Sequence, residues 1–142
     1  MQGFESDAVM NGTFGEVWFD GEYMAEVTKC RLEVSIEYEE ISRVRNLTPG
    51  QKMVATKPEG EVSFHKVSST VTRKVADKIR QGKSPKFTII SNLDDPNALG
   101  AERVAAYGCA FEKLGLADWE SGSVGEENYS FKFEEFELLD LV

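Results

Sequence analysis

The sequence is poor in the residues that build most catalytic and metal sites. It has one histidine and two cysteines in 142 residues. His65 alone cannot form a catalytic triad or a histidine-rich metal site, so an exposed histidine on a strand is the simpler interpretation. Cys30 and Cys109 lack the paired spacing of a zinc knuckle, and we expect two buried free thiols, with a disulfide between strands as the alternative. These absences predict a protein that is not an enzyme and holds no cofactor or metal.

Other absences narrow the class further. No apolar run approaches the roughly twenty residues of a membrane helix, and residues 1–7 lack the pattern of a secretory signal. We therefore expect no membrane contact and a soluble product made in the cytoplasm. The 16 basic residues are outnumbered by 25 acidic ones, for a formal net charge of -9. Because nucleic-acid-binding proteins normally carry a basic surface, this balance argues against sequence-independent binding of nucleic acid.

Alternation of apolar and polar residues predicts a protein built mainly of β-strands. Over 28–38 the alternation is unbroken, which is typical of a strand with one buried face. Asp20 and Gly21 suit the two positive-φ positions of a tight hairpin turn. Phe136 is out of phase with the aromatic residues before it, so we expect a bulge or strand end near Glu134. The expected strands are 16–19, 23–27, 28–38, 61–67, 86–93, 102–112 and 129–133.

Residues 39–60 interrupt this pattern. A hairpin turn normally needs about two to five residues, whereas loops much longer than this are usually lids, binding arms or disordered segments. The interval is rich in charged residues, and we expect it to form a long inter-strand loop. A second flexible loop is expected at 117–127, which is rich in glycine and serine, and its Trp119 is a candidate anchor in a core or an interface.

One segment changes to the period of a helix. Val71, Val75 and Ile79 recur every four residues and place one apolar stripe along a helix. A serine and a threonine at 69–70 can cap its start. Gly82 stands where a left-handed residue ends many helices. This is the one substantial helix that the sequence predicts.

Together these patterns predict the fold class. We expect a single domain over 1–142 that is mainly β: an antiparallel β-sandwich or barrel of about seven strands with one external α-helix. Residues 1–12 have little stabilising context, so they are expected to form an N-terminal arm.

Charge is distributed unevenly along the chain. Basic residues crowd around the expected helix, and acidic residues gather near the C-terminus. The simplest interpretation is a solvated helix surface. The alternative is that the two patches meet between neighbouring copies and set a head-to-tail assembly. The basic patch is Arg73, Lys74, Lys78, Arg80 and Lys83, and the acidic patch is Glu134, Glu135 and Glu137.

The order of several short segments resembles that of the tail tube proteins of contractile phages and phage-like particles, of the PBSX type. The segments that carry the likeness are 15–21 with 24–26, 65–69, 82–88, 93–96 with 100–104, and 131–136. Members of this family are structural proteins, and type VI secretion tube proteins are similar in fold. A secretion-like tube protein is therefore the closest alternative function.

The resemblance implies a homohexameric ring whose subunits donate strands to one inner β-barrel. Rings stack into a tube that serves as a conduit for DNA or effectors, without binding DNA specifically. The implied partners are further copies of the chain, a tail sheath protein, and baseplate and tail-terminator proteins. The implied location is the tail of a virion or phage-like particle that is assembled in the bacterial cytoplasm. An open antiparallel sheet fits this picture, because pairing between subunits satisfies its edges.

Within that picture two sets of residues have expected roles. The polar side of the strands would face the lumen, through Glu33, Ser35, Glu37, Ser63 and His65. The long loop would contact the next ring, through Ile41, Val44, Leu47 and Met53.

Two other classes of protein remain as alternatives. A small-ligand-binding barrel similar to a lipocalin would need a closed barrel with short turns, which fits the 39–60 interval poorly. An acidic hydrolase would use paired carboxylates, but Asp94 and Asp95 stand beside a proline where turn caps are common.

Overall fold

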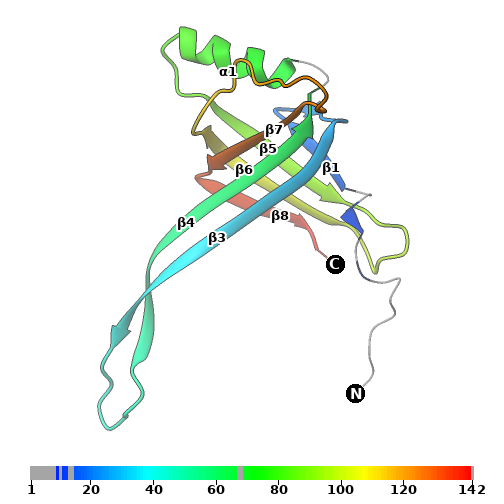
Figure 1. Ribbon diagram of the computed structural model, residues 1–142. Coiled ribbons are helices and arrows are strands. Elements are labelled where there is room, and N and C mark those ends of the chain that lie inside the picture. Colours follow the sequence, from blue (N-terminus) through cyan, green and yellow to red (C-terminus); the bar gives the residue numbers. More distant parts are fainter. Residues whose placement is uncertain (1–8, 10, 13–14, 67–68, 142) are drawn as a thin grey trace.

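The computed structural model describes residues 9, 11–12, 15–66 and 69–141. Most of the expected arm at 1–12, and the end of the strand expected at 61–67, therefore lie outside the described residues. The fold is an antiparallel sheet of eight strands with one helix, and the strand order is β2-β1-β5-β6-β7-β4-β3, with β8 also paired to β6 (Figure 1). The elements are β1 (Gly15–Phe19), β2 (Glu22–Tyr23), β3 (Val27–Ile41), β4 (Gly50–His65), α1 (Thr70–Arg80), β5 (Lys86–Leu93), β6 (Glu102–Phe111), β7 (Glu126–Lys132) and β8 (Glu135–Asp140).

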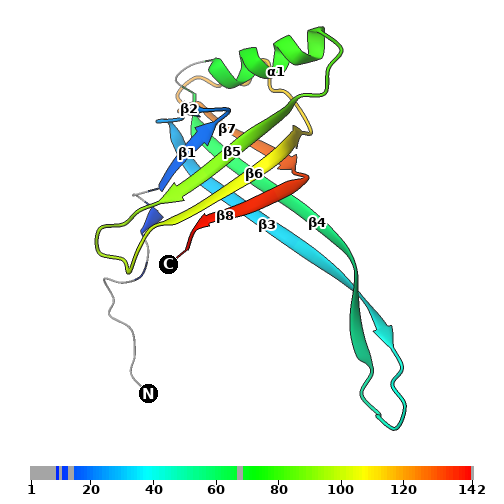
Figure 2. The ribbon, with the colours of Figure 1, turned by 180° about the vertical axis from the view of Figure 1, so that it is seen from behind.

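The sheet folds over on itself to enclose the core. In both ribbon views, β5, β6 and β8 cross β3 and β4, and α1 lies at one end of the body (Figures 1 and 2). Aromatic rings fill the space between the two layers: the ring of Phe111 has its centroid 5.7 Å from that of Phe87 and 5.6 Å from that of Phe131. Val62 and Phe64 are buried in the same core, as their alternation in the sequence predicts.

The tight turn predicted at Asp20 and Gly21 is confirmed in the first hairpin. Asp20 has φ of 52° and Gly21 has φ of 87°, which are the two left-handed positions of a primed turn. The turn sets Trp18 opposite Tyr23, and their ring centroids are 5.3 Å apart.

The region 39–60 is not the long loop that we expected. β3 and β4 continue as a paired hairpin as far as Ile41 opposite Gly50, so a turn of eight residues, 42–49, is all that lies outside the ladder. The sequence concealed this because a register shift after Glu37 breaks the period and because charged residues stand among the apolar ones of the distal strands. From here on, the arm means residues 36–56 of this hairpin and not the N-terminal segment 1–12. It projects well beyond the body (Figure 1).

The helix matches its prediction except at its last turn. Val71 and Val75 are buried against the sheet, whereas Ile79 is 51% exposed because the helix end overhangs the body. The C-terminal end of α1 is capped as expected, because Gly82 has a left-handed φ of 70°. The N–H of Gly82 donates to the carbonyl of Ile79 at 3.0 Å, and the N–H of Lys83 donates to the carbonyl of Lys78 at 3.0 Å. At the other end Ser69 is the N-cap residue but makes no side-chain cap bond.

The C-terminal segment breaks where predicted and then forms an eighth strand that the sequence did not predict. β7 ends at Lys132, and the N–H of Glu134 donates to the carbonyl of Tyr107 at 3.0 Å. The chain then turns onto a different stretch of β6 as β8, which leaves Phe136 half-exposed. Since β7 and β8 share one edge of β6, the sheet splits at this point into its two layers.

Candidate functional site: the assembly surfaces

The outer face of β3, β4 and β7 carries polar and charged side chains of both signs. Cross-strand register places Glu33 opposite Glu59 and Glu37 opposite Ala55, so one face of the ladder gathers the odd-numbered residues. Arg31 contacts Glu33 and lies 3.6 Å from Glu61. The hydrogen bond from Arg31 to Glu33 raises the pKa of the guanidinium.

The residues expected to face a lumen share this surface. Glu33, Ser35 and Glu37 are exposed along β3, and His65 is exposed at the end of β4 opposite Glu126. Ser63 differs, because it is 4% exposed and its hydroxyl hydrogen-bonds to the side chain of Asn128. It belongs to the same face by register but adds little accessible surface.

Ion pairs along this face partly balance its charge. The ammonium of Lys57 lies 2.5 Å from the carboxylate of Glu37, and the ammonium of Lys132 lies 4.0 Å from that of Glu112. The pairing raises the pKa of Lys57, mainly through its hydrogen bond to Glu37. Ion pairs that are this exposed contribute little to the stability of the fold. Their main effect is on the electrostatic potential at the surface.

The tip of the arm, residues 42–49, is ordered by its own hydrogen bonds. The guanidinium of Arg43 donates to the carbonyl of Thr48 through Nε at 3.1 Å and Nη2 at 2.8 Å. The N–H of Thr48 donates to Oδ1 of Asn46 at 2.9 Å. Val44 and Leu47 are left pointing to solvent, and Val44 is 92% exposed. A turn that is preorganised while holding apolar side chains in water is typical of a binding element.

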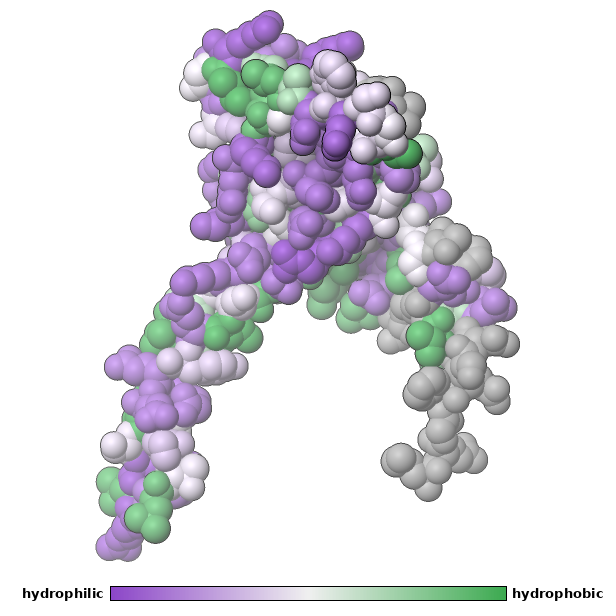
Figure 3. All heavy atoms as spheres, viewed as in Figure 1, coloured by the Kyte–Doolittle hydropathy of each residue, from purple (hydrophilic) through white to green (hydrophobic). Residues whose placement is uncertain are grey.

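The other two residues expected to contact a neighbouring ring are also exposed. Ile41 lies at the end of β3, and Met53 of β4 lies opposite Tyr38 of β3. Figure 3 shows hydrophobic side chains distributed along the arm. Sequence reasoning missed Ile36 and Tyr38, which continue the apolar side of β3 past the core and are exposed there. The sequence did contain a sign of this exposed surface. The alternation over 28–38 makes one face of the strand apolar over a greater length than the core covers.

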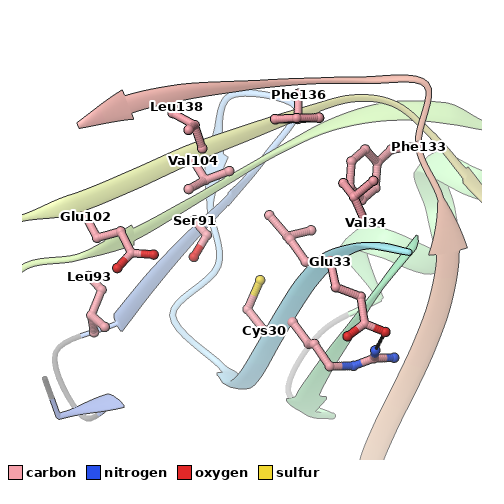
Figure 4. A pocket seen from close by; sticks show the side chains of 12 residues that line it. Cys30, Glu33, Val34, Ser91, Leu93, Glu102, Val104, Phe133, Phe136 and Leu138 are labelled. Atoms are coloured by element: carbon pink, nitrogen blue, oxygen red, sulfur yellow. Dashed lines mark hydrogen bonds and ion pairs between the residues drawn. The ribbon is translucent and has the colours of Figure 1, made fainter. Parts of the chain in front are cut away.

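A mainly apolar cavity opens between the layers at the base of the arm, with Arg31, Glu33 and Glu102 among the residues that line it (Figure 4). Its volume is about 530 Å³. Cys30 and Val34 line it from β3, Val104 from β6, and Phe136 and Leu138 from β8. Because the last two are more than half exposed, the core remains unsealed on this side. The cavity continues into the apolar side of the arm, which makes one extended apolar surface without a partner in the described chain.

Three strands of the described sheet border on one neighbour only. Throughout 15–66 and 69–141, β3 ends the strand order and pairs with β4 alone, the two-residue β2 ends it on the other side and pairs with β1 alone, and β8 pairs with β6 alone. A free edge of 15 residues such as β3 is a ready template for pairing with another chain. The fold therefore does not close its own barrel.

The two charge patches are partly used within one chain. The ammonium of Lys74 lies 3.2 Å from the carboxylate of Glu22, and that of Lys78 lies over the ring of Phe87 at 4.8 Å from its centroid. In the acidic patch, Lys86 holds Glu134 at 2.6 Å. The hydroxyl of Tyr107 donates to Glu137 at 2.9 Å, a bond that raises the pKa of the tyrosine.

The remaining members of the patches project into solvent. Arg73, Arg80 and Lys83 are exposed around α1, and Glu135 is exposed at the start of β8. The other four members, Lys74, Lys78, Glu134 and Glu137, use their charges in two ion pairs, a cation–π contact and a hydrogen bond within the chain. This arrangement weakens the patches as a source of head-to-tail recognition.

Both cysteines are free, but only one of them is buried as expected. Cys109 is fully buried, and burial raises its pKa to about 12, whereas Cys30 is half-buried at the wall of the cavity. Burial also raises the pKa of Cys30. The described part of the chain holds no cluster of three or more histidine, cysteine or acidic residues that could bind a metal ion. Nor does it contain a helix long and apolar enough to cross a membrane.

Comparison with known proteins identifies the family and the fold of the chain. "Phage-like element PBSX protein XkdM" of Bacillus subtilis (strain 168) is 29% identical over 131 residues, which cover 91% of this chain and 89% of that protein. A chain of the "PVC sheath-tube complex in extended state" of an extracellular contractile injection system superposes with a TM-score of 0.70 at 10% identity, over 98% of this chain and 100% of that chain. A chain of the "anti-feeding prophage cap (AFP tube terminating cap)" gives 0.73 at 10% identity, over 99% and 97%.

The two structural matches show that the fold is shared, whereas the assignment to a family rests on the sequence. The sequence model of a family described as "Phage tail tube protein" matches residues 2–140, nearly the whole chain. The resemblance inferred from short segments is thereby confirmed, as is the mainly antiparallel β fold. The protein belongs to the phage tail tube family and is a structural component of a tail tube.

Proposed function

We propose that the chain assembles into homohexameric rings that stack into the inner tube of a contractile phage tail or tail-like particle. The observation that supports this most directly is the open edge of β3 beside an unsealed core. Pairing that edge with a neighbouring subunit satisfies the free backbone groups, and covering the cavity removes apolar surface from water. A monomer gains neither, so the ring is the stable state of the subunit.

The polar face of β3, β4 and β7 then lines the lumen. Glu33, Ser35, Glu37 and His65 are the exposed lining residues, and Ser63 lies beneath them. Charges of both signs, paired within the face, leave no continuous basic track for a phosphate backbone to follow. Such a surface passes DNA or an effector without holding it.

The arm provides contact between stacked rings. It extends away from the body along one direction and presents Ile41, Val44, Leu47 and Met53 to solvent. Burying these four side chains against the next ring contributes hydrophobic stabilisation that the isolated subunit lacks. The basic residues Arg73, Arg80 and Lys83 remain exposed around α1 and are available for contact with a tail sheath protein.

The remaining partners follow from a tube of finite length. A baseplate protein starts the stack, and a tail-terminator protein ends it, each meeting one of the two different ends of a ring. Assembly takes place in the bacterial cytoplasm before the particle is released. The chain has a purely structural role in this process.

The experiment replaces residues 37–55 with Asn-Gly. Ile36 and Thr56 are direct cross-strand partners, so a two-residue primed turn can join them without disturbing the body. We expect the variant to fold with an unchanged β-sheet circular dichroism spectrum but to form no tubes. The wild-type chain should show hollow rods with six-fold end views by electron microscopy. A wild-type protein that stays monomeric at high concentration, or tubes of normal length from the variant, would contradict the proposal.

A further inference from the structure

We infer that the tip of the arm docks on the loop between β6 and β7 of a second copy of this chain. The inference rests on the proposed stacking and names the surface that receives the arm. Both ribbon views place the tip at one end of the molecule, and α1 with the β6–β7 loop at the opposite end (Figures 1 and 2). Stacking copies along this long axis therefore brings the tip of one against the loop of the next.

The receiving loop, residues 113–125, is held at both ends and exposed between them. The N–H of Gly115 donates to the hydroxyl of Tyr129 at 3.3 Å, and the N–H of Lys66 donates to the carbonyl of Gly125 at 2.9 Å. Leu114 packs on the core. These contacts hold the base of the loop in place, so its exposed residues are presented from a fixed position.

The exposed part of the loop is unusually apolar for its setting. Trp119 is 86% exposed, and Leu116 and Val124 are similarly uncovered. Single exposed apolar residues are ordinary, but three in nine residues, one of them tryptophan, form a candidate anchor. Tryptophan and arginine are the residues that most often dominate the energy of protein interfaces.

Charge selects the tip of the arm as the matching surface. Residues 42–49 contain Arg43 and Arg45 and no acidic residue, whereas residues 116–124 contain Asp118 and Glu120 and no basic residue. The guanidinium of Arg43 is tied to the backbone of its own turn, which leaves Arg45 to reach the partner. Its contact combines an ion pair with a carboxylate and a cation–π contact with Trp119, while Val44 and Leu47 meet the apolar residues of the loop.

This contact is heterologous, because the two surfaces are different and lie at opposite ends of the molecule. Each docked copy presents a free tip at one end and a free loop at the other, so the contact cannot close on itself along the axis and propagates as a filament. A tube that grows by stacking needs an interface of this type.

Charge reversal tests the pairing. Arg45→Asp reverses the charge of the arginine that is free to reach the partner, while suiting the left-handed backbone there, where φ is 60°. Asp118→Lys with Glu120→Lys reverses the loop. We expect each change to raise the protein concentration needed for tube assembly by about tenfold, and the combination to restore it to within about threefold of wild type. Lys52→Glu, which makes the same kind of charge change on the shaft of the arm, is the matched control and should have little effect.

Cross-linking tests the geometry without relying on charge. We expect a variant with both Leu47→Cys and Leu116→Cys to form a ladder of covalent oligomers on mild oxidation, because each disulfide joins successive copies. Each single variant, and the wild-type chain with its buried Cys109 and half-buried Cys30, should remain monomeric in denaturing gels.

The outcomes separate the inference from the function on which it rests. Dimers from Leu47→Cys alone would show that tips meet tips, and the inference would be wrong. Wild-type tubes without a ladder from the double variant, or without rescue by combined charge reversal, would overturn the docking site and leave the proposed tube intact. If the wild-type chain forms no tubes and the double variant no ladder, both proposals fall.

Discussion

Gly60 lies in the part of β4 that belongs to the body, and replacing it with alanine should destabilise the subunit. Gly60 lies opposite Leu32 in β3 and Phe131 in β7. A Cβ added there would stand 2.6 Å from the carbonyl oxygen of Arg31 and 2.7 Å from Cζ of Phe131. Both distances are far below van der Waals contact, so either the strand or the ring must move.

Neither neighbour can move freely. The carbonyl belongs to the backbone of a paired strand, and the ring of Phe131 is 1% exposed with other aromatic rings around it. Forcing one extra methyl group into a packed core costs about 1–3 kcal/mol. With a urea m-value of about 2 kcal/mol/M, the unfolding midpoint of Gly60→Ala should fall by about 0.5–1.5 M relative to wild type.

The measurement is urea unfolding followed by circular dichroism, at a concentration where light scattering shows monomers. Gly12→Ala is the control, because a Cβ there meets nothing within 4 Å, and it should stay within about 0.5 kcal/mol of wild type. Phe131→Leu should cost less in the Gly60→Ala background than alone, since a smaller side chain relieves part of the clash. A midpoint for Gly60→Ala equal to that of the control would refute the reasoning.

Three further predictions concern other local features. Gly82→Ala places a side chain at φ of 70° with nothing within 4 Å, so backbone strain alone should lower the free energy of unfolding by about 1 kcal/mol in thermal melts; an unchanged melting temperature would contradict it. Tyr129→Phe removes the acceptor for the N–H of Gly115 and should cost about 1 kcal/mol, with faster hydrogen exchange at that amide; unchanged protection would count against this contact. With a pKa of about 12, the Cys109 thiol should resist iodoacetamide at pH 8 in the folded protein and react in urea, as read by mass spectrometry. Rapid labelling of the folded protein would show that the thiol is accessible.

Several elements were predictable because their causes are local. Asp20-Gly21 makes a primed turn through the backbone freedom of those two residues, and Gly82 ends α1 for the same reason. The buried pair Val62 and Phe64 followed from alternation alone, since a strand must place successive side chains on opposite faces. The family likeness also lay in short ordered segments that needed no structure to be compared.

The arm and β8 were not predictable in this way. Residues 39–41 and 50–60 are strand because β3 and β4 supply each other with backbone hydrogen bonds, and such pairing leaves no hydrophobic pattern where both faces are wet. β8 forms because the turn after Phe133 places it against a free stretch of β6. Ile79 fits the helical stripe but is exposed, since the sheet beneath α1 ends before the helix does.

The candidate site shows the same division. Alternation placed Glu33, Ser35 and Glu37 on one face, which is a property of any strand. Which charges are already paired, and which surface remains uncovered, depended on elements far apart in the chain: Lys86 meets Glu134 across 48 residues, and the cavity forms where β3, β6 and β8 converge. Local backbone preferences and side-chain periodicity act between near neighbours and can be inferred from residue order, whereas an open edge or an unsealed core exists because distant segments pack and leave part of their surface without a partner.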